Sequence, residues 1–120
     1  MKQRTCHFAL PKHTRLQNSI QFDRVFRNPT YRLTRAQILL LAASNNLNHS
    51  RLGMVVGRKA APSAVIRNRI KRVLRESFRH RALAPFDIVV LAKSTNVNDE
   101  KPDLRYTVDS LFNELESKSR

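Results

Sequence analysis

The arginines and lysines between positions 58 and 81 are the residues of this chain whose types and spacing could do chemistry. The segment reads RKAAPSAVIRNRIKRVLRESFRHR and holds nine Lys or Arg side chains against a single acid, Glu76. Guanidinium groups bind phosphates by charge and by planar, bidentate hydrogen bonds, and they also stack on bases. Asn68, which stands among them, offers a donor and an acceptor to a sugar hydroxyl or a base edge. The chemistry indicated is the binding of a nucleic acid.

A helix over about 64–80 is expected to present these side chains, with Ser63 capping its first turn. On a helical projection the apolar residues gather on one face and the cations on the other. The apolar face holds Ile66, Ile70, Val73, Leu74 and Ser77 with Phe78 at its edge, the opposite face holds Asn68, Lys71, Arg72, Arg75 and Arg79, and Arg67 and Arg69 flank the apolar stripe. One face can thus dock on a sheet while the other presents cations about a turn apart.

The charge of the whole chain points the same way. The 120 residues carry a net charge of +14, with a pI near 11.4. Residues 1–98 hold 19 Lys or Arg against three acids, whereas residues 99–120 hold four against six. Such an excess is typical of proteins that bind a polyanion. An anionic membrane surface is the second candidate, but the apolar face of the basic helix is better explained by packing in a core.

Residues for catalysis or metal binding do not stand out. The sequence has no paired carboxylates, no nucleophilic triad and no glycine-rich phosphate loop, and its four histidines share no metal-ligand spacing. A stand-alone nuclease would need carboxylates to hold a metal, and the basic part of the chain has three acids. We therefore predict no catalytic residue and no metal ligand in the chain.

The compartment is predicted from what the sequence lacks. Cys6 is the only cysteine, so no intrachain disulfide can form, which suits a reducing cytosol. Residues 1–20 contain no continuous apolar stretch of the kind found in signal peptides. The longest apolar run, 38–43, is far short of the roughly 20 residues that a membrane span needs. The expectation is a cytoplasmic protein without a membrane partner.

The remaining elements follow from hydrophobic periodicity and from stop signals. We expect a helix over about 19–27, strands over 36–43, 51–57 and 86–92, and a last helix over about 103–117. Asn18 can cap the first helix, with Gln21 three residues on, and Asn28-Pro29 ends it. Residues 1–14 are expected to be extended or flexible and 118–120 to form a tail.

These elements predict one α+β domain over 1–120, an α/β sandwich in which three helices cover a sheet of about four strands. The short polar loop at 44–50 predicts that the strands on either side of it pair antiparallel. Strand, helix and strand in succession over 51–92 predict a crossover unit, so the sheet should be mixed.

A family resemblance becomes specific in the basic helix. The run Arg67-Asn68-Arg69-Ile70-Lys71-Arg72, continuing to Arg75-Glu76, resembles the RNR motif of the bacterial ribonuclease P protein. Residues 51–59 (RLGMVVGRK) resemble that family's strand and following basic pair, 22–26 (FDRVF) its first helix, and 87–93 (DIVVLAK) its last strand. The similarity covers roughly residues 15–115, in the same order.

The resemblance implies a function and a set of site residues. Ribonuclease P matures the 5′ end of precursor tRNA. Its RNA subunit performs the Mg²⁺-dependent hydrolysis and holds most of the metal, and the protein is an accessory subunit with no obligate protein partner. The residues implied to bind the catalytic RNA are Arg58, Lys59, Arg67, Asn68, Arg69, Lys71, Arg72 and Arg75. Those implied to bind the single-stranded 5′ leader, in a cleft between the first helix and the sheet, are Arg15, Phe22, Phe26 and Lys93. The resemblance also implies a left-handed strand–helix–strand crossover, against the usual rule.

Several alternatives stay open on the sequence alone. Phe22 and Phe26 have the i, i+4 spacing of core residues, and Lys93 fits an ordinary surface lysine equally well. Relatives can carry an aromatic residue on the strand facing the cleft, whereas this chain has leucines at 39–41. A ribosomal protein that binds rRNA is the second function that the composition fits. A DNA-binding regulator is disfavoured because no helix precedes 64–80 at a short turn.

Overall fold

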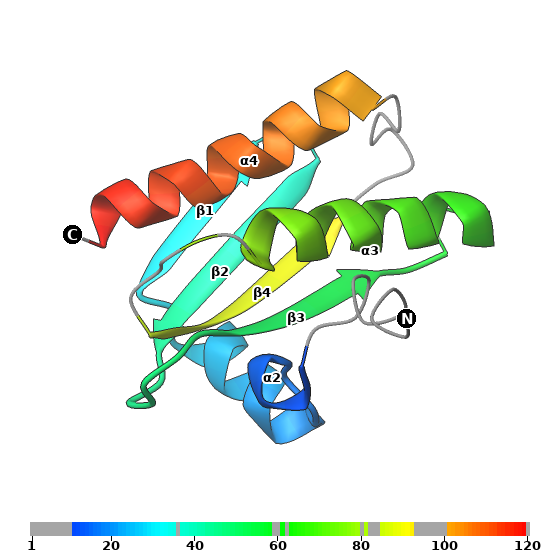
Figure 1. The fold of residues 1–120 in the computed structure, drawn as a ribbon. Helices are drawn as coiled ribbons and strands as arrows, with labels where there is room; N and C mark the ends of the chain where they lie inside the picture. The colour runs from blue at the N-terminus through cyan, green and yellow to red at the C-terminus, as the bar shows by residue number, and fades with distance from the viewer. Residues whose placement is uncertain are drawn as a thin grey trace, which may run out of the picture.

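A sheet of four strands runs through the molecule, with helices on both of its faces (Figure 1). The computed structural model describes residues 11–35, 37–58, 61, 63–79, 81, 85–92 and 101–119, without the side chains of 101–103. The elements in chain order are a 3-10 turn η1 (Lys12–Thr14), α2 (Ser19–Arg27), β1 (Tyr31–Arg35), β2 (Ile38–Ser44), β3 (Arg51–Val56), α3 (Ala64–Arg79), β4 (Phe86–Ala92) and α4 (Lys101–Lys118). The predicted α+β class, with three helices and a mixed sheet, is confirmed.

The strand order is β1-β2-β4-β3, which makes the predicted antiparallel pairing of β2 with β3 wrong. β2 pairs antiparallel with both β1 and β4, and β3 pairs parallel with β4. The central position goes to β4 because its first five residues are all buried, whereas β3 carries exposed and half-buried positions. β3, α3 and β4 thus form a crossover unit between parallel neighbours, and its left-handedness stays a prediction.

Strand β1 has no counterpart in the sequence predictions. Only its middle residue, Leu33, is buried, so its apolar pattern is weak. Contacts distant in sequence support it: the Tyr31 hydroxyl donates to the Lys118 carbonyl at 3.0 Å, and Arg35 pairs with Glu114 at 3.5 Å. Because α4 supplies both partners, this edge strand depends on a helix far along the chain.

Helices α3 and α4 lie side by side on one face of the sheet (Figure 1), α3 against β3 and α4 against β1. The main core lies beneath them, because every second strand residue points to this face. It includes Ile70, Leu74 and Phe78 of α3, Leu104, Val108, Leu111, Phe112 and Leu115 of α4, and Leu40, Leu52, Ile88 and Val90 of the sheet. The apolar face predicted for the basic helix is therefore confirmed as core, and α4 buries an apolar stripe beside it.

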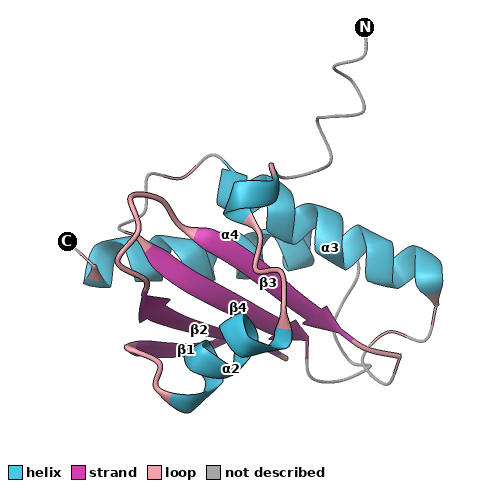
Figure 2. Cartoon of the chain, turned by 90° about the horizontal axis from the view of Figure 1, so that it is seen from below, coloured by secondary structure: helices cyan, strands magenta, loops and turns pink. Residues whose placement is uncertain are grey.

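Helix α2 covers the opposite face of the sheet, here named the α2 face (Figure 2). Val25 is fully buried there, and Phe22 packs beside it against a smaller cluster that includes Leu41 and Val89. The helix begins as predicted: the Gln21 amide donates to Asn18 Oδ1 at 3.0 Å, and Gln21 Oε1 accepts from the Gln17 amide. It ends at the predicted Asn28 cap.

The ends of the chain are more ordered than the sequence indicated. Residues 1–10 lie outside the described residues, but Lys12–Thr14 form a 3-10 turn and Arg15 bridges to Leu52 on the outer edge of β3. His49 Nε2 lies 2.8 Å from the His13 carbonyl, and the two rings meet edge to face. At the other end α4 continues through Lys118, one residue beyond the helix predicted over about 103–117.

A buried ion pair connects β3 and β4 at the end where both strands begin. Arg51 donates through Nε and Nη2 to the Asp87 carboxylate at 2.8 and 2.7 Å, and Asn45 of the preceding loop donates to Asp87 Oδ1 at 3.0 Å. The Asp87 side chain is 2% exposed. The hydrogen bond from Arg51 to Asp87 outweighs desolvation and raises the pKa of Arg51. Loop and strand ends are thereby held together.

Asp87→Ala is expected to lower the free energy of unfolding by about 3–5 kcal/mol, because the buried Arg51 loses its counter-charge. Glu114→Ala is the matched control, since it breaks the exposed pair with Arg35 and should cost no more than about 1 kcal/mol. Urea unfolding followed by circular dichroism measures both. Equal, small losses in the two variants would contradict the role given to Asp87.

Candidate nucleic-acid interface

Helix α3 begins at a serine cap, as predicted. Ser63 Oγ accepts from the amides of Val65 and Ile66 at 3.1 and 3.4 Å. The buried residues of the helix are Ile70, Leu74, Ser77 and Phe78. Because this face is taken up by the core, the cations of the opposite face are left at the molecular surface.

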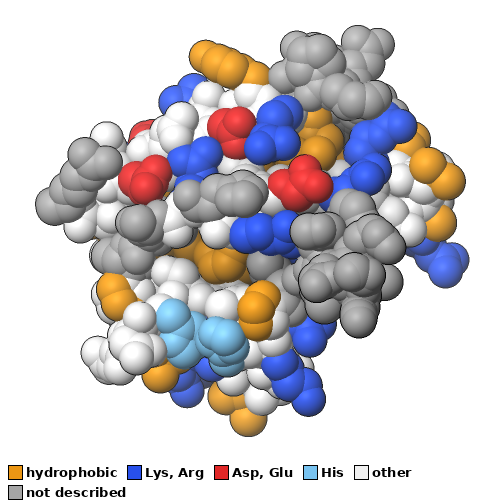
Figure 3. Space-filling view, in the orientation of Figure 1, with side chains coloured by type: hydrophobic (Ala, Val, Ile, Leu, Met, Phe, Trp, Pro, Cys, Tyr) orange, Lys and Arg blue, Asp and Glu red, His pale blue; other side chains and the backbone are white. Residues whose placement is uncertain are grey.

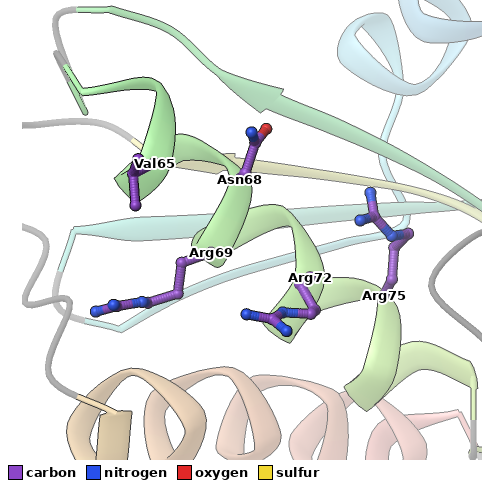
Figure 4. A pocket seen from close by; sticks show the side chains of 5 residues that line it. All are labelled: Val65, Asn68, Arg69, Arg72 and Arg75. Carbon is purple, nitrogen blue, oxygen red and sulfur yellow. The ribbon is translucent and has the colours of Figure 1, made fainter.

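A hollow of about 370 Å³ opens on the outer side of α3, lined by Val65, Asn68, Arg69, Arg72 and Arg75 (Figure 4). Arg69 and Arg72 extend to one side of the helix, and Asn68 and Arg75 extend to the other (Figure 4). Three guanidinium groups and one amide therefore border the same open space. Oxygen-rich anions are the ligands that such a set of donors fits.

Arg75 and Arg79 stand out among the cations of α3 because their guanidinium groups are partly buried. The Nε of Arg75 and one terminal nitrogen of Arg79 are shielded from solvent and have no hydrogen-bond partner among the described residues. Burial lowers the pKa of Arg75, and the charges of Arg79, Arg72 and Arg15 lower it further against the opposing effect of Glu76. Burial and like charges thus both act against the charged form of Arg75, and a bound anion would offset the repulsion.

The charge of Arg15 also belongs to this region. Leu16 points to the α2 face, where it joins the small cluster with Val25, and successive residues of an extended segment point to opposite faces. Arg15 is therefore directed to the α3 side of the sheet edge, which agrees with its effect on the pKa of Arg75. The resemblance grouped Arg15 with the leader residues, but the structure brings it toward the basic helix.

The other predicted RNA-binding residues differ in exposure. Arg58 is exposed beyond the end of β3, and Lys71 is half-buried on α3. Arg67 donates to the Ala61 carbonyl at 3.0 Å, so it also holds the turn that precedes the helix. Lys59 lies outside the described residues. We name the set Arg15, Arg58, Arg67, Asn68, Arg69, Lys71, Arg72, Arg75 and Arg79 the α3 surface.

Acidic side chains collect along the seam between α3 and α4, where they meet other arginines. Arg81 pairs with Asp109 and Glu116 at 3.3 and 3.0 Å, donates to Asn113, and stacks over Phe112. Figure 3 shows acidic and basic side chains next to one another on this half of the molecule. Burial alone would raise the pKa of Asp109, but the Ser77 hydroxyl and the nearby arginines lower it overall. These acids are thus occupied within the seam.

The predicted leader residues are not all brought together. Phe22 is half-buried on the α2 face, and Phe26 is 42% exposed at the end of the same helix. Neither ring is fully buried: Phe22 packs against the small cluster on this face, and Phe26 does not belong to that cluster. Leu39 and Leu41 point to this face. They lie on the strand where relatives can carry an aromatic residue facing the cleft. Lys93 lies outside the described residues.

The chain is similar over most of its length to proteins of one family. A sequence model described as ribonuclease P matches residues 10–116. The ribonuclease P protein component of Pseudomonas paraeruginosa is 45% identical over 103 residues, which are 84% of this chain and 76% of that protein. The chain belongs to the ribonuclease P protein family. The counterpart from Idiomarina loihiensis is 41% identical over 106 residues, 87% of this chain and 85% of that one.

Solved structures of the ribonuclease P family have the same fold. The protein from Thermotoga maritima superposes with a TM-score of 0.67 at 30% identity, over 86% of this chain and 96% of its own. A variant of the Staphylococcus aureus protein superposes at 0.77 and 26% identity, over 86% and 88%. The chain is therefore the accessory protein subunit of ribonuclease P, and the ribosomal alternative is not favoured.

Two features of the α3 surface were missed in the sequence set. Arg79 was placed on the outward face of the helix but not among the site residues, although its spacing of four from Arg75 is a usable signal. The approach of Arg15 to Arg75 has no sequence signal, because it depends on the pairing of Arg15 with β3. Within the described residues no helix is long and apolar enough to cross a membrane.

Sulfate is expected to raise the melting temperature more than chloride does at matched ionic strength. An anion that binds only the folded state stabilises it by RT ln(1 + [L]/Kd), about 2.7 kcal/mol at a hundredfold excess over Kd. Arg75→Ala should reduce this sulfate-specific increment, and Arg35→Ala, which removes a charge outside the α3 surface, should preserve it. Circular dichroism melts provide the measurement. Superimposable sulfate and chloride titrations would rule out preformed phosphate sites.

Proposed function

We propose that the α3 surface binds the RNA subunit of ribonuclease P through its phosphates and sugars. The observation that carries this proposal is the hollow on α3, where Asn68, Arg69, Arg72 and Arg75 border one open space. A phosphate in this space would accept from several donors and relieve the repulsion that lowers the pKa of Arg75. Arg15 would contribute a charge to the same surface from the edge of β3, in place of the leader contact that the resemblance implied.

The α2 face is proposed to take the single-stranded 5′ leader of precursor tRNA. Phe26 at the end of α2 is partly exposed, and so are Val55 and Leu91 on the strands that share this face. Bases stack on aromatic rings with little sequence demand, which suits leaders of varied sequence. Lys93, which follows β4 directly in the sequence, would add a charge for the leader backbone.

The Mg²⁺ of the reaction is proposed to be held by the RNA subunit. The described residues of the protein do not fit a resident metal, because no three His, Cys, Asp or Glu side chains among them gather around one point. The carboxylates of Asp87, Asp109 and Glu116 are engaged by arginines. The protein's part is then to bind and orient the two RNAs. Purified protein with Mg²⁺ is accordingly expected to cleave precursor tRNA only after the RNA subunit is added.

Arg72→Ala is expected to weaken binding to the RNA subunit and to reduce the salt slope of log K by about 1, because one phosphate contact is lost. The residue is exposed, so the free energy of unfolding should change by no more than about 0.5 kcal/mol. Filter binding over a range of KCl concentrations measures the slope. Arg35→Ala removes the same charge beside α4 and should leave it unchanged. Equal slopes in both variants would speak against the α3 surface as the RNA interface.

Phe26→Ala is expected to weaken binding of precursor tRNA relative to mature tRNA by about 1–3 kcal/mol, the range for one stacked base. The ring is 42% exposed, so the stability loss should stay below the roughly 3–5 kcal/mol typical of a core phenylalanine. Ile20→Ala removes an apolar side chain that is 69% exposed on the same helix and serves as the control. Both tRNAs are titrated against the reconstituted holoenzyme. Equal weakening of both would exclude a leader contact at Phe26.

A further inference from the structure

Phe22 rests on the one strand position of β3 that has no side chain. A Cβ atom built on Gly53 would lie 2.6 Å from both Cε2 and Cζ of Phe22, and 2.9 Å from Cδ1 of Leu16. Carbon atoms in van der Waals contact are about 3.5–4.0 Å apart. Even the single methyl group of alanine therefore has no room while the ring stays where it is.

The glycine is required by space and not by backbone conformation. No described glycine has a positive φ, so an L-residue could adopt the backbone of Gly53 without strain. Glycine inside a strand often marks a place where another part of the molecule approaches closely. Here the approaching part is the edge of an aromatic ring from α2.

The neighbours of Gly53 show why the ring of Phe22 fits at this position and not elsewhere in the row. In the sheet register Gly53 pairs with Val89, which pairs with Leu41, and all three belong to the row beneath α2. Val89 is fully buried and Leu41 nearly so, and both have branched side chains. Leu16 approaches the same point from the segment that pairs with Leu52. Its backbone amide donates a hydrogen bond to the Leu52 carbonyl at 3.1 Å. Val89 and Leu41 thus fill their positions with branched side chains, and the ring of Phe22 lies over Gly53, which has none.

We propose that Gly53 is a positioning residue for leader binding: it sets the depth at which the Phe22 ring lies on the α2 face. The proposal rests on the proposed binding of the leader to this face. A side chain at position 53 would push the ring out by about 1 Å, the difference between the present approach and ordinary contact. Phe22 is only half-buried, so it can move outward without unfolding the core. The surface that a leader base meets would then change.

Gly57 offers a matched control four residues along the chain. It follows β3 directly, it is exposed, and a Cβ atom built on it would meet no atom within 4 Å. Gly57→Ala and Gly53→Ala make the same chemical change and have the same effect on the unfolded chain. Only the second places a methyl group against Phe22.

The test compares Gly53→Ala, Phe22→Leu, the double variant and Gly57→Ala in holoenzyme reconstituted with a ribonuclease P RNA. The quantity measured is the ratio of the affinities for precursor and mature tRNA. We expect Gly53→Ala to lower this ratio about tenfold, equivalent to about 1.4 kcal/mol, and Gly57→Ala to leave it unchanged. Phe22→Leu should lower it as well, and the double variant should be no worse than Phe22→Leu alone, because residues in contact are not additive. An unchanged ratio in Gly53→Ala, or additive losses in the double variant, would overturn the proposal.

A second measurement does not use Gly53→Ala, so it still tests the proposal if that variant fails to fold. The ring current of Phe22 should displace the Hα resonances of Gly53 in the NMR spectrum of the full chain, and Phe22→Leu should remove that shift. Identical Gly53 resonances in the two proteins would overturn the packing on which the proposal depends.

The outcomes separate this proposal from the proposed leader function. If Phe22→Leu loses the Gly53 shift but keeps the affinity ratio, the leader does not bind at Phe22, and the positioning role falls with it. If Phe22→Leu lowers the ratio while Gly53→Ala does not, the leader binds at Phe22, but Gly53 does not set the depth of the ring.

Discussion

Lys71, Arg75 and Arg79 stand about one turn apart along α3, and like charges at this spacing oppose the helix that carries them. Burial lowers the pKa of Arg75, and the charges of Arg79 and Arg72 lower it further. The helix persists because its other face is packed on the sheet, where burial of a side chain such as Ile70 or Leu74 contributes about 1.5–3 kcal/mol. The repulsion among cations arises on the outer face of α3, and the stabilisation by burial arises on its inner face. The fold therefore maintains a surface that a polyanion stabilises.

The placement of the acids keeps that surface positive. Asp109 and Glu116 lie on α4, where Arg81 and Arg105 hold them in the seam between the two helices. Arg81 is largely buried and joins the end of α3 to three residues of α4 by charge and hydrogen bonds. The acids thus strengthen helix packing and are kept from neutralising the cations that face outward. The low net charge of residues 99–120 has a structural role in this arrangement.

Strand β3 connects the two proposed RNA-binding surfaces. Arg15 and Leu16 pair with its outer edge and, because adjacent residues of an extended segment alternate, they serve opposite faces of the sheet. Arg15 acts on the charges of α3, while Leu16 and Gly53 shape the place where Phe22 rests. The catalytic RNA and the leader would therefore approach the protein from two sides of one strand edge. A mutation at this edge can affect one surface or the other, because successive residues point to opposite faces of the sheet.

The sequence by itself determined the basic face of α3 and most of the helices and strands. Periodicity of 3.6 placed Ile70 and Leu74 in the core and Arg72 outside, and capping residues at Asn18 and Ser63 marked the helix starts, because these signals act within a few residues. Only the tertiary structure decided the strand order, the existence of β1, and the positions of Arg15 and Phe22. These depend on which strand buries more apolar surface, on contacts made by α4, and on the space left by Gly53, all of which join residues far apart in the chain. Local patterns carry no information on such contacts, and so the predicted pairing of β2 with β3 was wrong although the strands were placed correctly.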